Sequence, residues 1–177
     1  AEGHPLLREG VMVHEWQHID LKNKYDVMVQ DVIATVVEGR LYLLNGYQDD
    51  EAAKKPLGTT LQGLTDYLTN RDNPVYADVV RRLLVMIMKK GCSDIKKHIQ
   101  DVRSIVEKRY GVKDLSFDVD AIIKEVYAFE KVYYGINVDE KLASYDQKIM
   151  DQTMNMLSDK VVIEQVKPKA VILDIRD

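Results

Sequence analysis

The sequence predicts an all-α fold: a helical bundle of five to six helices, with a long N-terminal helix and a short β-rich or extended C-terminal arm. Apolar residues recur at helical spacings through most of the chain. Glycines follow four of these periodic segments, where a helix C-terminus favours them. They are Gly46, Gly91, Gly111 and Gly135. We expect an N-terminal arm (residues 1–10), a helical bundle domain (residues 11–159) and a C-terminal arm (residues 160–177).

The first periodic segment covers residues 11–45 and contains no proline. It predicts one long helix, or two collinear helices with a break near residues 21–24. A polar loop follows over residues 48–58, and Thr59 or Thr60 can cap a short helix that ends near residue 69.

The next two helices have clear start and stop signals. Asn73 places a capping side chain directly before Pro74, whose fixed φ suits the first helical position. This helix is predicted to run to Lys90. Ser93 is expected to cap another helix, which reaches Tyr110.

The last two helices are also predicted from their caps. Ser116 or Asp118 begins one of them, which ends near Tyr134. Asn137 and Glu140 have the spacing of a capping box for a final helix to about residue 159.

The C-terminal arm has a different character. Residues 161–166 and 170–175 are short β-branched runs on either side of Pro168. They predict a hairpin, or an extended arm that adds to a neighbour.

Composition excludes several classes of protein. With 31% charged residues, no stretch approaches the roughly 18–20 apolar residues that a membrane-spanning helix needs. The 46% hydrophobic content and net charge of -4 exclude a disordered chain. One cysteine, Cys92, excludes an internal disulfide framework, and we expect its thiol to be inert. No signal peptide is visible. These features predict a protein of the cytoplasm, or of a viral or other macromolecular assembly.

One motif has the spacing of a metal site. His14-Glu15-Trp16-Gln17-His18 matches H-E-x-x-H, and on a helix it places both imidazoles on one face, where they can bind one zinc ion. The five residues resemble the motif of zincin metallopeptidases. The resemblance implies a zinc-dependent hydrolase in which Glu15 acts as general base on the metal-bound water.

The third zinc ligand is not evident from the sequence. On one continuous helix Glu38 would lie about 30–36 Å from the pair, because each residue adds 1.5 Å. His98 and Asp94, one turn apart, offer another ligand set with His14 and His18 between two helices. The alternative is that the two histidines bind no metal and serve as packing and hydrogen-bonding groups.

The charge is unevenly distributed along the chain. Residues 81–110 contain nine basic and three acidic residues, a net charge of +6 against -10 for the remainder. On two neighbouring helices the basic residues would form one face able to neutralise phosphates. The candidate nucleic-acid contacts are Arg81, Arg82, Lys89, Lys90, Lys96, Lys97, Arg103 and Lys108. The alternative is that they pair with acidic residues of the same chain or of a second subunit.

The leading functional prediction is a non-enzymatic, self-associating structural protein that needs no cofactor. The apolar pair Leu6-Leu7 is expected to anchor in a groove of this subunit or of the next one, and the C-terminal β-branched runs are expected to dock on a partner. A capsid-type subunit that coats nucleic acid through residues 81–110 is its most specific form. The alternative prediction is the zinc-dependent hydrolase.

Overall fold

The computed structural model describes residues 5–46, 74–90, 92–113, 115, 118–145 and 148. These residues form six α-helices and contain no strand, which confirms the predicted all-α helical bundle. The helices are α1 (Pro5–Leu21), α2 (Val27–Gly46), α4 (Pro74–Lys90), α5 (Ile95–Tyr110), α6 (Val119–Tyr134) and α7 (Val138–Ser144). None of these helices combines the length and apolar character needed to cross a membrane.

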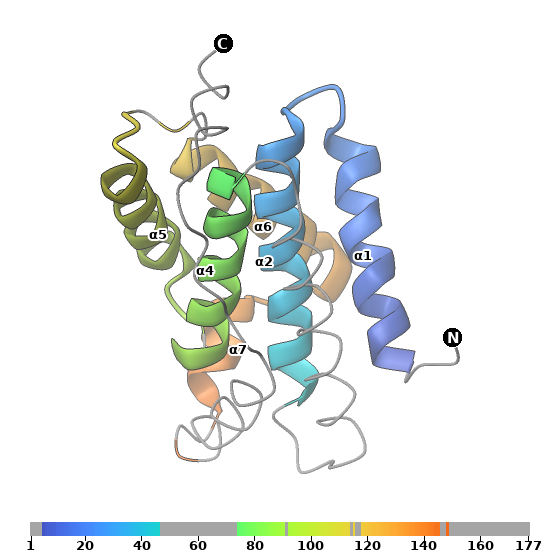
Figure 1. The fold of residues 1–177 in the computed structure, drawn as a ribbon. Coiled ribbons are helices and arrows are strands. Elements are labelled where there is room, and N and C mark those ends of the chain that lie inside the picture. Colours follow the sequence, from blue (N-terminus) through green and yellow to red (C-terminus); the bar gives the residue numbers. More distant parts are fainter. Residues whose placement is uncertain are drawn as a thin grey trace.

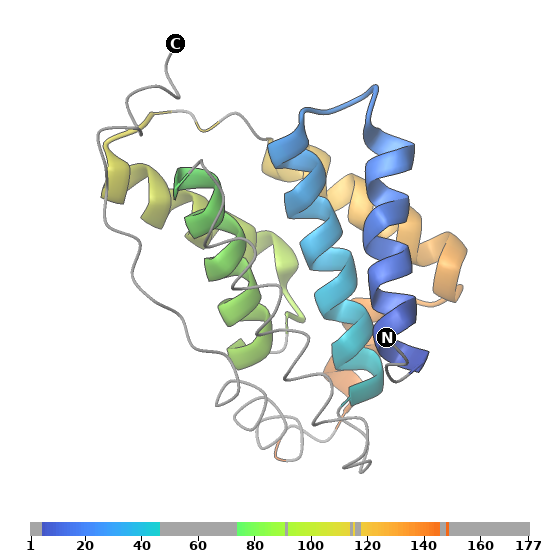
Figure 2. The same cartoon turned by 45° about the vertical axis from the view of Figure 1, so that its right-hand side comes forward.

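Helix α2 lies at the centre of the bundle (Figure 1). It packs against α1, α4, α6 and α7, whereas α5 packs against α4 and α6. The view in Figure 2 shows α1 and α2 side by side at one edge, with α6 crossing them on one side. A site between α1 and α2 therefore has one wall at the surface of the molecule and the other in its core.

The long N-terminal helix predicted over residues 11–45 is corrected to a helical hairpin. The chain turns at residues 22–26, where the carbonyl oxygen of Leu21 accepts hydrogen bonds from the amides of Lys24 (2.9 Å) and Tyr25 (3.0 Å). Asp26 then caps α2 by accepting from the amide of Val29 at 3.0 Å. The two helices are antiparallel rather than collinear, so their apolar sides bury each other.

The N-terminal arm predicted over residues 1–10 is also corrected in its described part. Helix α1 begins at Pro5, whose fixed φ suits the first helical position. Leu6 is buried within this same chain, and Gly10 is buried in the middle of α1. This leucine therefore does not need a second subunit to cover it.

The downstream boundaries largely follow the predictions. Helix α4 spans Pro74 to Lys90, and α5 and α6 end at the predicted tyrosines, each followed by a left-handed glycine. The side chain of Asn137 accepts from the amide of Glu140 at 3.0 Å, as its predicted cap requires.

Two details of these helices differ from the predictions. The cap of α5 is Asp94 rather than Ser93. Helix α7 ends at Ser144, because the next residue, Tyr145, has an extended backbone. The short helix predicted near residues 59–69 and the C-terminal arm lie outside the described residues.

The burial of α2 is what positions the functional site. All residues from 29 to 44 are buried, and they include polar and charged side chains. These are Gln30, Asp31, Thr35, Glu38 and Arg40. A buried polar group that lacks a hydrogen-bond partner costs free energy. We therefore expect the polar side chains of α2 to have partners on the neighbouring helices.

Candidate metal centre

The helical hairpin brings His14 and His18 of α1 against Asp31 of α2. One atom of Asp31, Oδ1, lies 2.8 Å from Nε2 of His18 and 3.6 Å from Nε2 of His14. The two imidazole rings stand 5.2 Å apart between their centroids. Ligand atoms of all three residues lie within 4.8 Å of one another, close enough to hold one metal ion between them.

The opposite nitrogen of each ring is held by a hydrogen bond from α2. Nδ1 of His14 donates to Oε1 of Glu38 at 2.8 Å, and Nδ1 of His18 donates to Oε1 of Gln30 at 3.0 Å. The amide group of Gln30 has its nitrogen on the carbonyl oxygen of Tyr25 at 2.8 Å, which leaves its oxygen for His18. Such outer partners orient metal-binding imidazoles, so both Nε2 atoms are directed to the same point.

Two tyrosines hold the carboxylates in turn. Tyr76 of α4 donates to Oδ2 of Asp31, and Tyr42 of α2 donates to Oε2 of Glu38 at 2.5 Å. Tyr42 reaches this position across Gly10 of α1, where an added Cβ would lie 2.1 Å from the tyrosine oxygen. The glycine therefore admits the ring that fixes Glu38.

The electrostatics favour positive charge at this point. Burial alone would lower the pKa of His14, but its hydrogen bonds to Asp31 and Glu38 outweigh burial and raise the pKa to about 9. In the metal-free protein at neutral pH, a proton on His14 therefore satisfies the two carboxylates. A metal cation is the other positive species that can take this place.

The geometry fits a tetrahedral ion with little rearrangement. Ligands at 2.0–2.2 Å from zinc stand roughly 3.3–3.5 Å apart. The 3.6 Å between His14 and Asp31 is close to this separation, whereas the 2.8 Å between His18 and Asp31 must lengthen when a metal enters. The side chains of His14, His18 and Asp31 are 13%, 25% and 9% exposed. His18 is the most exposed of the three side chains. Three protein ligands would leave a fourth position for water or substrate.

The structure differs from the ligand sets considered in sequence. Glu38 does not lie about 30–36 Å away, because the chain reverses at residues 22–26 and returns it to His14. His98 is buried on α5, with Nδ1 at 2.5 Å from the carbonyl oxygen of Asp94. Neither His98 nor Asp94 belongs to the cluster of His14, His18 and Asp31.

The predicted general base does not lie in the cluster. Glu15 is exposed, and it makes no hydrogen bond or ion pair with any described residue. The acidic side chains that contact His14 are Glu38 and Asp31 of the second helix. The H-E-x-x-H motif of residues 14–18 therefore contributes its two histidines to the cluster, but not its glutamate.

A second buried polar cluster lies elsewhere around α2. Arg40 is fully buried and donates two hydrogen bonds to Glu130 of α6, at 2.7 and 3.0 Å. It also donates to the carbonyl oxygen of Cys92 at 2.7 Å and pairs with Asp139 of α7 at 2.8 Å. Burial raises the pKa of the Cys92 thiol to about 12, although Arg40 opposes the change. This thiol is protonated at neutral pH, as expected for an inert cysteine.

The basic segment is paired mainly within the chain. Arg81 is buried, so the surface position predicted for it is corrected. Lys96 pairs with Asp120 of α6 at 2.8 Å. Lys97 and Arg103 pair with acidic residues one turn further along α5. Lys89 and Lys90 form the end of α4, Arg82 is half-buried, and Lys108 is exposed.

Comparison with known proteins gives no relative. No protein family, no curated protein and no solved structure matches this chain. The functional argument therefore rests on the geometry of the molecule.

Proposed function

We propose that the protein binds a divalent transition-metal ion, with zinc favoured, through His14, His18 and Asp31, and that this centre is hydrolytic. The observation that carries the proposal is the convergence of both Nε2 atoms on Oδ1 of Asp31, while both Nδ1 atoms are held from behind. Isolated packing histidines do not require this double orientation.

The chemistry of the donors supports zinc. Two imidazoles and one carboxylate suit zinc and neighbouring transition metals, whereas Mg²⁺ and Ca²⁺ prefer oxygen ligands alone. Three protein ligands with an open position are typical of catalytic zinc, whereas structural zinc has four. A zinc-bound water has a pKa of about 7 and becomes a nucleophile at neutral pH.

The roles of the surrounding residues follow from their contacts. Glu38 orients His14 and raises its basicity, and Tyr42 in turn fixes Glu38. Tyr76 fixes the remaining oxygen of Asp31. The proposed hydrolase is therefore built on a helical hairpin, with its third ligand from the second helix.

The direct test is zinc binding by isothermal titration calorimetry after chelator treatment. We expect one zinc per chain, and loss of this stoichiometric binding in His14→Gln, His18→Gln and Asp31→Asn. Glu38→Gln keeps all three ligands and should weaken binding by about 10–100-fold. Unchanged binding in the ligand variants, or no binding at all, would contradict the proposal.

A histidine outside the cluster provides the matched control. His98→Gln also removes one imidazole, and we expect its zinc affinity to equal that of the unmodified protein. If His98→Gln lost zinc, the ligand set of His14, His18, His98 and Asp94 would be favoured instead.

A second readout uses the proton on His14. Because its pKa is about 9, zinc binding at pH 7.5 should release at least one proton from this site. Titrations in buffers of different ionisation enthalpy measure that release.

Hydrolysis of an activated ester by the zinc-loaded protein, absent in Asp31→Asn, would test the catalytic part of the proposal separately.

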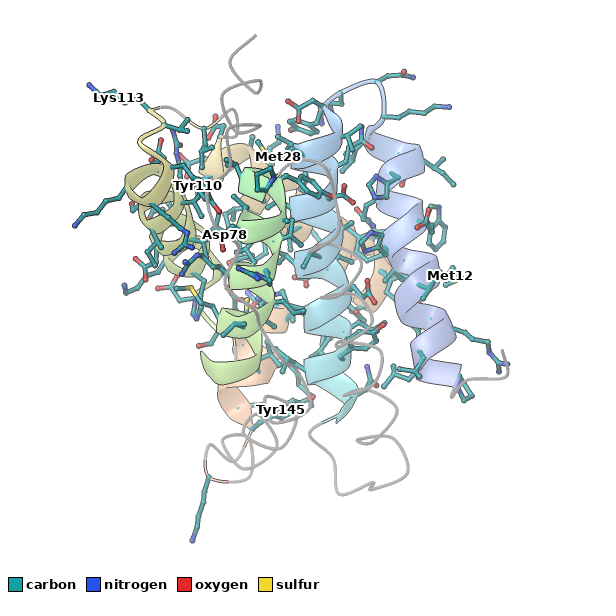
Figure 3. All side chains as sticks on the ribbon, viewed as in Figure 1. Met12, Met28, Asp78, Tyr110, Lys113 and Tyr145 are labelled. Carbon is teal, nitrogen blue, oxygen red and sulfur yellow. The ribbon has the colours of Figure 1, made fainter. Side chains whose placement is uncertain are left out.

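We also propose self-association through the outer face of α1, as a second candidate function. Met12, Trp16 and Ile19 are 48%, 43% and 65% exposed on this helix, and Met12 points away from the bundle (Figure 3). Exposed apolar residues in one place favour a protein contact. Light scattering across a concentration series should show a dimer that Ile19→Glu dissociates; a monomer throughout would exclude this candidate.

A nucleic-acid-coating role stays a prediction and is the weaker one. It requires accessible, unpaired cations. Of the eight candidate contacts, Arg81 is buried, and Lys96, Lys97 and Arg103 pair with acidic residues of the same chain.

A further inference from the structure

A pocket of about 490 Å³ lies where α6 turns into α7. Gly135 ends α6 in a left-handed conformation, and Asn137 caps α7 two residues later. This tight turn brings Asp139 of α7 beside Tyr127 of α6, whose hydroxyl donates a hydrogen bond to Oδ2 of Asp139. The pocket therefore has walls from two helices, and its volume lies in the range of small-molecule sites, about 300–1,000 Å³.

The inner wall of the pocket carries more negative than positive charge. Glu130 of α6 and Asp139 both line the pocket, and both pair with the buried Arg40, at 2.7 and 2.8 Å. Two carboxylates thus share one guanidinium group, so negative charge exceeds positive charge by one in this cluster. Glu130 is buried, whereas the side chain of Asp139 is 25% exposed. Asp139 is therefore the carboxylate that a ligand can reach.

The hydroxyl of Tyr127 belongs to the same polar wall. Burial and the hydrogen bond to Asp139 raise the pKa of Tyr127, so the hydroxyl keeps its proton at neutral pH and donates it to the carboxylate. The hydroxyl oxygen still has lone pairs that can accept a hydrogen bond. A primary ammonium group has three donors and a positive charge, so it can bind Asp139 and Tyr127 together.

The rest of the lining supplies a positive charge and apolar surface. Lys131 of α6 lines the pocket, is exposed, and forms no ion pair with any residue that the structure describes. Ile136 and Val138 add apolar side chains to the lining, and Ile136 is exposed together with the ring of Tyr127. The pocket thus combines one surplus negative charge, one positive charge and an apolar wall.

We propose that this pocket binds a free α-amino acid with an apolar side chain. The ammonium group of the ligand pairs with Asp139, and its carboxylate pairs with Lys131. Its side chain packs against Tyr127 and Ile136. An amino acid carries one charge of each sign, so it matches both the surplus negative charge of the inner wall and the charge of Lys131. This site is separate from the metal centre between α1 and α2, and the inference does not rest on the proposed function.

The test is isothermal titration calorimetry of the full chain with three probes at neutral pH. L-leucine has both charges, L-leucinamide lacks the carboxylate charge, and isocaproate lacks the ammonium group. We expect leucine to bind and each analogue to bind about tenfold more weakly or worse, because each loses a charged hydrogen bond. The proposal is overturned if leucine does not bind, or if either analogue binds as tightly. Equal binding of leucinamide would favour the amino terminus of a peptide.

Two exposed lysines of α6 provide a matched pair of variants. Lys131→Gln should weaken leucine binding by about tenfold or more without weakening leucinamide binding, because only leucine has the carboxylate. Lys124→Gln removes the same charge two turns earlier on α6, outside the pocket, and should leave the leucine affinity unchanged. Equal effects of the two substitutions on leucine binding, or no effect of either, would overturn the proposal.

Two neighbouring acids of α7 test the other end of the ligand. Asp139→Asn should weaken leucine binding by about tenfold or more, since the ammonium group loses its charged partner. Glu140→Gln removes an exposed carboxylate outside the pocket and should leave binding unchanged. Equal leucine affinity in the two variants would contradict the assignment. Asp139 also pairs with Arg40, so urea unfolding checks that Asp139→Asn folds; if it does not, Lys131→Gln at its exposed position decides.

Discussion

Helix α2 carries two buried polar clusters that differ in what their charges can do. Asp31 and Glu38 face α1, whereas Arg40 lies about 180° away from Asp31 around the helix axis, toward α6 and α7. Both clusters are built from charged groups that a helix interior would normally exclude. Their burial is similar, but their chemistry is different.

The cluster of Arg40 is permanently charged, and each of its three guanidinium nitrogens has a partner. A guanidinium cannot lose its proton in proteins, and its donors are taken by Glu130, by Asp139 and by a backbone carbonyl. The cluster of His14 and His18 has nitrogens that accept either a proton or a metal. The cluster of Arg40 therefore holds α2, α6 and α7 together, whereas the cluster of His14 and His18 is the one that we propose to bind a metal.

The largest expected effect comes from removing the permanent charge. Arg40→Met would leave Glu130 buried without its counter-ion and should lower the free energy of unfolding by about 3–5 kcal/mol. Urea unfolding measures this loss. Zinc affinity of the folded variant should not change, because the metal centre lies on the other face of α2.

A double variant separates lost charge pairing from lost packing. Arg40→Met combined with Glu130→Met should recover much of the stability, because no buried charge is then left unpaired on α6. If the double variant were as unstable as Arg40→Met alone, the cluster would not act through its charge. A parallel loss of zinc affinity would mean that the two clusters are coupled.

The second largest expected effect is a pH dependence of the unfolding free energy, which comes from the cluster of His14 and His18. The folded-state pKa of His14 is about 9 and its ordinary value is 6.5. A raised histidine pKa stabilises the fold fully below pH 6.5, and this contribution is lost as pH rises through 9. The difference corresponds to about 3 kcal/mol in the metal-free protein.

The measurement is urea unfolding of the metal-free protein between pH 6 and about 9.5, a range set by the two pKa values. We expect His14→Gln to flatten the profile, whereas His98→Gln should retain it. Saturating zinc should also flatten it, since the metal replaces the proton. A stability that rises with pH over this interval would contradict the assignment.

A smaller effect tests how closely α1 must approach α2. Gly10→Ala would place a methyl group 2.1 Å from the oxygen of Tyr42, so the ring must move away from Glu38. We expect a loss of about 1–3 kcal/mol in unfolding free energy, together with weaker zinc binding. Calorimetry and urea unfolding measure the two quantities.

The control is the same substitution on the partner helix. At Gly39 an added Cβ would lie 3.1 Å from a methyl group of Ile87, a contact that a small shift relieves. Alanine also favours a helix over glycine by about 1 kcal/mol. Gly39→Ala should therefore cost less than Gly10→Ala, and the opposite order would show that Tyr42 adapts easily.

Much of the fold could be predicted from local signals in the sequence. The start of α4 at Pro74 and the cap of α7 at Asn137 are properties of a few neighbouring residues. The hairpin between α1 and α2 could not be predicted in the same way. Its turn over residues 22–26 contains neither glycine nor proline, so apolar periodicity continues across it.

The candidate metal centre could be predicted only in part, because one of its contacts depends on the hairpin between α1 and α2. The spacing of His14 and His18 is local, and it identified two of the three proposed ligands. Asp31 reaches the two histidines because the chain reverses, and no pattern at fixed sequence spacing predicts this contact. The available signal was the polarity of Asp31 and Glu38 within a helix whose other residues are largely apolar.

The smallest effect is expected where charges are exposed, as on α5. Lys96→Gln and Lys97→Gln, made together, remove two exposed ion pairs with acidic residues of the same chain. Water already screens these pairs, so the unfolding midpoint should stay within experimental error, and zinc affinity should not change. The same variant tests the predicted nucleic-acid surface by fluorescence anisotropy with a labelled oligonucleotide, where binding through these cations must fall steeply with salt. A clear loss of stability would show that the exposed ion pairs of α5 stabilise the fold as the buried Arg40 cluster does. Burial would then not explain the difference between these ion pairs and the two clusters of α2.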